Sequence, residues 1–431
     1  MIKLGKIISY SLVLLCFIFI FILLFRTYIY DLNLFYYSKY FYFVGIFLIF
    51  AILSFYIKDE IKINIFIFSL SIIFTLYLLE TFLTYNEWKN RLGDKRSLTS
   101  FYKSQLDKYD NLTTLIPPSA FLQTHKSDYF PLSLIPNYNI VSCNENGEFI
   151  INQTDRYGFN SEDKEWDVNT IDFILIGDSF TYGMCEKKDN NFSGHINKNL
   201  NYDPKIINLG MPGNGPLISF ASLKEYFPKD KKVKNLIWFY YPNDWQNLLN
   251  EKNNRILMKY IEDKHFLQNL KEKSSYHKED YLEKNYLRNH QLKFKFLRLS
   301  KLNFLIQYFF SQKKNKINDT YNKNLELFLL IFKNIKEEYI DTNFYFVYLP
   351  GYGYYFSESK LIQDNLSKKI DYEFLESLDK IGIDVINIDK IFEKISDKRR
   401  LFSKHKTKNH YSSYGYEIVA KEIIKYKYSA N

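Results

Sequence analysis

A serine that could act as a nucleophile lies directly after a predicted strand. Ser179 stands in Gly177-Asp178-Ser179, behind the apolar run 171–176. In open parallel sheets ligands bind outside the carboxyl ends of the strands, and a serine on a glycine-containing turn there can expose its Oγ. The competing interpretation is a helix cap, in which Ser179 or Asp178 accepts backbone N–H groups. The motif taken alone is compatible with both.

Two later loops could donate hydrogen bonds to a developing oxyanion. The loop after the predicted strand 205–209 holds three glycines, among them Gly213 in Met-Pro-Gly-Asn. Glycine lets backbone N–H groups approach a ligand closely, although a tight turn is the simpler explanation of this loop. Asn243 follows the predicted strand 235–241, and its side-chain amide can donate to an oxyanion.

A histidine before the last predicted helix could serve as a general base. His410 precedes the helical stretch 413–427, and a neutral imidazole near Ser179 could accept its proton. His405 is the competing base, but its downstream spacing lacks the Gly-Tyr pair that leads from His410 into the helix. No paired Cys/His spacing suggests zinc.

In their order, the four motifs resemble the four blocks of the SGNH/GDSL hydrolase superfamily, over roughly 170–428 of this chain. Ser179 matches the nucleophile, Gly213 the second-block glycine, Asn243 the third-block asparagine and His410 the base. The resemblance implies a flavodoxin-like three-layer α/β/α fold and acyl chemistry through an acyl-serine intermediate, with no metal or organic cofactor.

The resemblance also implies an oxyanion hole formed by the N–H groups of Ser179 and Gly213 and the side chain of Asn243. Asp178 and Asp244, which flank the nucleophile and the asparagine, are expected to support the site rather than react.

Two positions depart from the family pattern. The family has Asp three residues before the histidine, where this chain has Thr407. A backbone carbonyl or another acid, such as Asp389 or Asp397, would then orient the imidazole, or the site works as a Ser-His dyad. Misorientation of the base lowers rates by orders of magnitude. Tyr241 stands where the third block begins with glycine, which would narrow the pocket or alter the loop.

Elements of alternating type position these motifs. Short apolar runs predict buried strands, and longer stretches with helical periodicity lie between them. Such alternation predicts a parallel sheet covered by helices. The strands are expected at 171–176, 205–209, 235–241, 343–349 and 383–388, and the helices at 190–200, 216–227, 320–340, 366–381 and 413–427.

The N-terminal residues 1–85 are expected to form a membrane region with about three transmembrane helices. Uncharged or nearly uncharged apolar runs cover 7–25, 40–57 and roughly 63–83, each long enough to span a hydrocarbon core of about 30 Å. Lys3 and Lys6 favour a cytoplasmic N-terminus, which with three spans places the large domain outside. Four basic residues that follow the third run, between 89 and 96, favour the opposite orientation.

The rest of the chain divides into a polar connector with a small β-rich cap at 86–165 and the hydrolase-like domain at 166–431. A helical insertion is expected at about 245–335. It is interpreted as a solvent-exposed insertion rather than as a lid or a partner-binding surface. The net charge of +10 comes from lysines scattered among acidic residues, so nucleic acid is not expected as a partner. Cys143 and Cys185 could pair in an oxidising compartment or remain free.

The leading functional hypothesis is a membrane-anchored serine esterase that removes acyl groups, acetyl for example, from a cell-surface glycan. The first alternative is an O-acyltransferase that modifies an exported polysaccharide with the same serine, and that would need a membrane partner to deliver the acyl donor. The second is a catalytically degenerate domain that binds glycan or scaffolds an assembly, an interpretation supported mainly by Thr407.

Overall fold

The structure is a computed structural model of the full chain. It describes residues 2–29, 38–122, 128–273, 277–290, 299–311, 316–356, 361–404 and 410–429. The chain separates into two compact units. The first contains Met1–Lys89 together with Lys293–Gln312, and the second contains Asn90–Leu292 and Lys313–Asn431.

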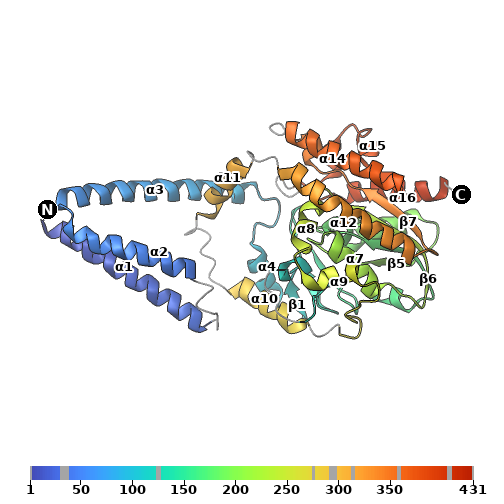
Figure 1. The fold of residues 1–431 in the computed structure, drawn as a ribbon, viewed down its shortest axis with the longest axis horizontal. Coiled ribbons are helices and arrows are strands. Elements are labelled where there is room, and N and C mark those ends of the chain that lie inside the picture. Colours follow the sequence, from blue (N-terminus) through green and yellow to red (C-terminus); the bar gives the residue numbers. More distant parts are fainter. Residues whose placement is uncertain are drawn as a thin grey trace. The chain divides into compact units, whose positions relative to one another are not determined.

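The first unit consists of apolar helices (Figure 1). Helices α1 (Ile2–Ile29) and α3 (Asp59–Asn90) are long and apolar enough to cross a membrane. Helix α2 (Ser38–Leu53) continues as a short 3₁₀ turn, and its apolar stretch Tyr40–Tyr56 is shorter than the other two. Most side chains of α1 and α3 are exposed rather than packed in a protein core. Helix α11 (Ser300–Ser311) also belongs to this unit.

The second unit is built on a five-stranded parallel sheet, and all five predicted strands are confirmed. The strands are β4 (Thr170–Ile176), β5 (Ile206–Asn208), β6 (Lys232–Tyr240), β7 (Asn343–Tyr348) and β8 (Asp384–Asn387). Their order is β5-β4-β6-β7-β8, with every neighbouring pair parallel. This is the flavodoxin-like order, whose switch point lies between the first and third strands, here β4 and β6. The predicted fold class is therefore confirmed.

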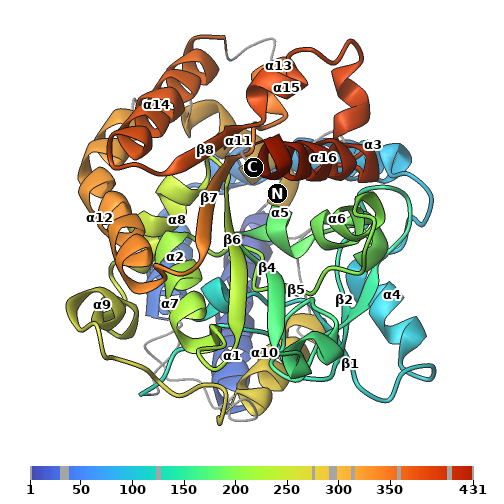
Figure 2. The same cartoon turned by 90° about the vertical axis from the view of Figure 1, so that its right-hand side faces the viewer.

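Helices cover both faces of this sheet (Figure 2). Alternate strand residues enter two separate cores: Ile174 and Trp238 join one, and Phe173 and Phe239 join the other. Each face therefore needs a layer of helices, and this need explains the nearly continuous apolar strands. One layer contains α7 (Pro216–Tyr226), α12 (Lys316–Glu338) and α14 (Leu361–Lys380); the other contains α6 (Phe192–Asn199) and α16 (Ser413–Ser429).

A small three-stranded sheet precedes the large one, within the segment expected to be β-rich. Strands β1 (Leu112–Thr114) and β2 (Asn139–Val141) pair in parallel, and β3 (Ile151–Gln153) pairs with β2 in the antiparallel sense. This sheet and the large one belong to the same compact unit. The remaining helices of the unit are α4 (Leu98–Gln105), α5 (Ser179–Tyr182), α8 (Asp244–Glu251), α9 (Arg255–Glu262), α10 (Lys278–His290), α13 (Gly353–Phe356) and α15 (Asp389–Phe392).

Candidate active site

The turn after β4 exposes Ser179 and caps the next helix with its neighbour. Gly177 has φ +148°, and a Cβ there would lie 2.5 Å from the carbonyl oxygen of Phe239, so only glycine fits. Asp178 Oδ1 accepts the backbone N–H of Phe180 at 2.9 Å and so caps helix α5. The cap is thus Asp178, and the half-buried hydroxyl of Ser179 is left for other contacts.

His410 meets that hydroxyl. Its Nε2 lies 3.0 Å from Ser179 Oγ, although 231 residues separate the two in the chain. The imidazole packs 5.0 Å from the ring of Phe180, measured between centroids. Its main chain is fixed by the hydrogen bond from Ser403 N to His410 O and by the buried neighbour Tyr411, whose hydroxyl donates to Pro350 O. The base and the nucleophile predicted from the sequence are therefore within hydrogen-bond distance.

Glu145 completes a chain of three residues, and sequence reasoning missed it. Its Oε1 lies 3.0 Å from His410 Nδ1, while its Oε2 accepts from Ser403 Oγ at 2.8 Å and from His410 N at 3.2 Å. The side chain is only 2% exposed. A carboxylate at Nδ1 selects the tautomer with the proton on Nδ1, so the Nε2 lone pair faces the serine hydroxyl.

The acids suggested by the sequence have other partners. Asp389 accepts hydrogen bonds from Tyr355 and Tyr372 and pairs with Lys368 at 2.7 Å. Asp397 caps the 3₁₀ turn Lys398–Leu401 through the backbone N–H of Arg399. Thr407 and His405 lie outside the described residues. The group at His410 Nδ1 is therefore an acid from the preceding segment, and not one of the two acids that the sequence suggested.

A disulfide holds the Glu145 segment beside the nucleophile turn. Cys143, two residues before Glu145, is bonded to Cys185, six residues after Ser179. Next to it, Asn146 Nδ2 donates to Glu186 Oε1 at 2.8 Å. The cysteine pair was the one signal in the sequence that could have located Glu145, because pairing the two cysteines brings this acid close to Ser179.

The loop after β5 offers backbone donors next to the nucleophile turn. Gly213 has φ +73°, and a Cβ there would lie 2.6 Å from Ser119 Oγ. The loop is tied to the turn by the hydrogen bond from Met211 N to Gly177 O at 3.1 Å. Within the described part of the chain, the N–H groups of Ser179 and Gly213 have no hydrogen-bond acceptor. These two groups are thus available to a ligand.

Glu251, at the end of α8, fixes the far side of the same loop. Its carboxylate accepts from Gly215 N at 2.5 Å and from Leu217 N at 2.9 Å, at the start of α7. Burial raises the pKa of Glu251 to about 7, and the backbone N–H groups that it accepts oppose this rise. Sequence reasoning did not single out this residue.

Asn243 is exposed and lies in the turn between β6 and α8, directly before the first residue of α8. Burial raises the pKa of Asp178 to about 6, and among the groups that oppose the rise is a hydrogen bond from the Asn243 side chain. Burial and then the negative charge of Asp178 raise the pKa of Asp244 well above its usual value. Besides accepting from Phe180 N through Oδ1, Asp178 has its Oδ2 3.5 Å from Ser179 Oγ.

Tyr241, the bulky residue at the glycine position of the family, packs against the site from the side. Its ring stacks on Phe180 with centroids 4.2 Å apart, on the residue next to the nucleophile. The side chain is half-buried. Its bulk is therefore absorbed by packing against Phe180.

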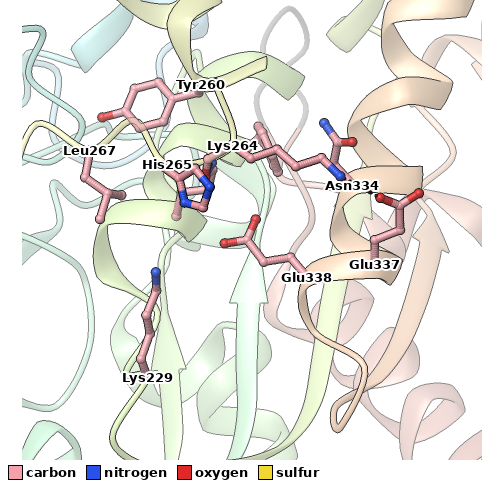
Figure 3. A pocket seen from close by; sticks show the side chains of 10 residues that line it. Lys229, Tyr260, Lys264, His265, Leu267, Asn334, Glu337 and Glu338 are labelled. Carbon is pink, nitrogen blue, oxygen red and sulfur yellow. Dashed lines mark hydrogen bonds and ion pairs between the residues drawn. The ribbon is translucent and has the colours of Figure 1, made fainter. Parts of the chain in front are cut away.

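A separate hollow of about 440 Å³ lies at the other edge of the sheet (Figure 3). Its lining includes Lys229, which precedes β6, and Glu337 and Glu338, which precede β7. These are the amino ends of the strands, whereas Ser179 follows the carboxyl end of β4. The charges are mixed and partly paired, as in the 2.9 Å ion pair between Lys264 and Glu337. The hollow contributes nothing to the Ser179 site.

No protein-family model matches this chain, and no curated protein sequence matches it. Among solved structures, the chain is similar to a protein from Desulfitobacterium hafniense DCB-2 that is named as a lipolytic protein of the G-D-S-L family. The two share 13% sequence identity with a TM-score of 0.33, over 60% of this chain and 99% of the other.

Proposed function

We propose that this chain is a serine hydrolase that cleaves acyl esters with Ser179 as its nucleophile. The observation that carries the proposal is the continuous contact from Ser179 Oγ to His410 Nε2 and from His410 Nδ1 to Glu145, each step 3.0 Å long. A nucleophile, a base and an acid in this order form a catalytic triad, which is recognised by geometry rather than by chain order.

In the proposed mechanism, His410 takes the proton of Ser179 as Oγ attacks the ester carbonyl carbon. The tetrahedral oxyanion is stabilised by the N–H groups of Ser179 and Gly213 and by the Asn243 amide, and one such donor contributes about 3 kcal/mol. The imidazolium is stabilised by Glu145 and returns its proton to the leaving alcohol. Water, deprotonated by His410, then cleaves the acyl-enzyme.

Glu145 also weakens the non-enzymatic alternative. That hypothesis depended on the missing Asp before the histidine, and a buried carboxylate at His410 Nδ1 supplies the same contact from elsewhere in the chain. We propose short acyl esters of a cell-surface glycan as the substrate class, because Asn243 is exposed and Ser179 is half-buried, so a group carried on a polymer can reach them.

Membrane anchoring is part of the proposal. Helices α1 and α3 supply two spans, and the apolar stretch Tyr40–Tyr56 of 17 residues would be the third, since 17 residues are about the minimum for a span. The disulfide between Cys143 and Cys185 favours an oxidising, extracytoplasmic side for the globular unit. Three spans put that unit on the side opposite the N-terminus, whereas two would not.

The test compares the wild-type chain with Ser179→Ala on a small aryl acetate and by labelling with a fluorophosphonate. We expect turnover to fall by about 10⁵-fold and labelling to disappear. Ser377→Ala, which removes an exposed hydroxyl on α14, is the matched control and keeps both. If the Ser179→Ala variant is still labelled and still hydrolyses the aryl acetate, the proposal is wrong. Product analysis with a glycan acceptor present then separates hydrolysis from transfer.

A further inference from the structure

The insertion between β6 and β7 contains a basic, aromatic segment that the proposed active site does not use. Residues 293–316 hold seven Lys or Arg residues and no acidic residue. Apolar and aromatic side chains stand between these charges. A basic segment interleaved with Leu and Phe is typical of helices that lie on anionic membranes. The basic residues are Lys293, Lys295, Arg298, Lys301, Lys313, Lys314 and Lys316.

Within this segment, helix α11 is attached to the long apolar helix α3 (Figure 1). Both oxygens of Glu80 accept the backbone N–H of Lys301, at 2.9 and 3.1 Å, and one also accepts that of Leu302 at 2.9 Å. Glu80 is only 1% exposed. Seven residues further along α3, or about two turns, Glu87 pairs with the ammonium group of Lys301. The start of α11 is thus fixed to α3 between residues 80 and 87.

The position of Glu80 along α3 indicates the depth of α11. The run 63–79 of α3 has no charged residue and is bounded by Lys62 and Glu80. Its 17 residues extend over roughly 26 Å at about 1.5 Å per residue, which is nearly the thickness of a hydrocarbon core. If α3 spans the membrane, Glu80 marks the boundary with the headgroups, and α11 begins at that boundary.

The side chains of α11 fit a lipid environment better than water. The uncharged polar residues Ser300, Asn303, Gln307 and Ser311 form a narrow stripe at the helical spacings 3, 4 and 4, and the one charged residue of the helix is Lys301 near its start. A helix with so little polar surface would be buried in a soluble domain. Yet Phe304 is 66% exposed and Ile306 is 45% exposed.

We infer that α11 is an interfacial helix that lies at the surface of an anionic bilayer beside α3. This inference rests on the membrane anchoring proposed above. Because the insertion connects β6 to β7, α11 attaches the hydrolase fold to the membrane at a second point in the chain, independent of the connection through α3.

The test places an environment-sensitive fluorophore on single cysteines in the full chain. Cys16→Ala removes the free thiol, and Cys143 and Cys185 are bonded to each other. Phe304→Cys reports on α11, Phe74→Cys on the middle of α3 (68% exposed), and Ile340→Cys on an exposed apolar site of the globular unit (81% exposed). The labelled proteins are reconstituted in vesicles of phosphatidylcholine and phosphatidylglycerol at 3:1, with spin-labelled lipids as quenchers.

We expect the label at 304 to be quenched at least about threefold more than the label at 340, and more by shallow than by deep spin labels. A label at 304 that behaves like the one at 340, while the label at 74 is quenched, would overturn the inference and leave the anchoring intact. Quenching at neither 74 nor 304 would refute the anchoring as well.

A second variant tests the attachment of α11 to α3. Glu80→Ala removes the acceptor at the start of α11, and we expect quenching at 304 to fall by about half. Glu60→Ala, which removes an exposed acid at the opposite end of α3, is the control and keeps full quenching. Equal quenching in both variants would contradict the role of Glu80.

Discussion

The candidate site draws on two regions that reach it by different physical means. Ser179, Gly213 and Asn243 follow the carboxyl ends of adjacent parallel strands, so the sheet brings them to one edge. Glu145 comes from the loop between β2 and β3 of the small sheet and is held by a disulfide and by hydrogen bonds. A regular sheet makes the first group predictable, whereas irregular tertiary contacts place the acid.

After the loss of Ser179 itself, the largest effect should come from Glu145, if the irregular region is as necessary as the regular one. Glu145→Gln preserves the size of the side chain but removes the charge that selects the tautomer of His410. We expect kcat on an aryl acetate to fall by about 10⁴-fold. The control is Asp397→Asn, at an exposed acid that caps a turn.

If Glu145→Gln keeps nearly full activity, the site works as a Ser-His dyad. A pH–rate profile separates the two cases, since loss of the carboxylate should also shift the pKa of the base in the free enzyme.

Asn243 tests the regular region. Asn243→Ala removes the proposed oxyanion donor, which is expected to donate only as charge develops, so kcat should fall by about 100-fold with little change in KM. Asn253→Ala, just after the end of α8, is the control, because Asn253 is exposed and donates to Leu249 O rather than to the Gly213 loop. A change confined to KM would assign Asn243 to substrate binding instead.

The disulfide should matter less than the acid that it positions. The double variant Cys143→Ser, Cys185→Ser leaves the hydrogen bonds from Ser403 and His410 to Glu145 intact. We therefore expect kcat to fall by only about tenfold, and the free energy of unfolding to decrease by about 2–4 kcal/mol. The matched comparison is the wild-type chain treated with a reductant. Unchanged kcat in both would show that the hydrogen bonds alone position Glu145.

The smallest effect concerns stability against pH. Burial raises the pKa of Asp155 and Asp371 to about 6 and that of Glu251 to about 7. Above about pH 4.5 these carboxyl groups have lost their protons in the unfolded chain but still hold them in the folded state. The free energy of unfolding therefore decreases as pH rises from 5 to 7. We expect Tm to be about 5 °C lower at pH 7.5 than at pH 5.

Glu251→Gln should reduce this slope, because it removes one of the raised carboxyl groups beside the Gly213 loop. Calorimetry at the two pH values measures the difference. A Tm that rises between pH 5 and 7.5 would contradict the raised pKa values.

The sequence by itself determined the regular part of this protein. Apolar runs at strand spacing and apolar faces at helical spacing predicted five parallel strands and the helices between them, because residues buried on both faces of a sheet leave a local signature. The same pattern located the loops that carry Ser179, Gly213 and Asn243, and the start of the last helix located His410. The long uncharged runs likewise predicted the apolar helices of the first unit.

Only the tertiary structure decided which acid faces His410 and where α11 belongs. Glu145 precedes Ser179 by 34 residues and lies in a loop with no periodicity, and Asp389 and Asp397 looked equally suitable until their own partners were visible. Helix α11 lies in the insertion between β6 and β7 but groups with α3 through Glu80. Such contacts join segments far apart in the chain, and each depends on the three-dimensional position of a single side chain, which no local pattern of residues encodes.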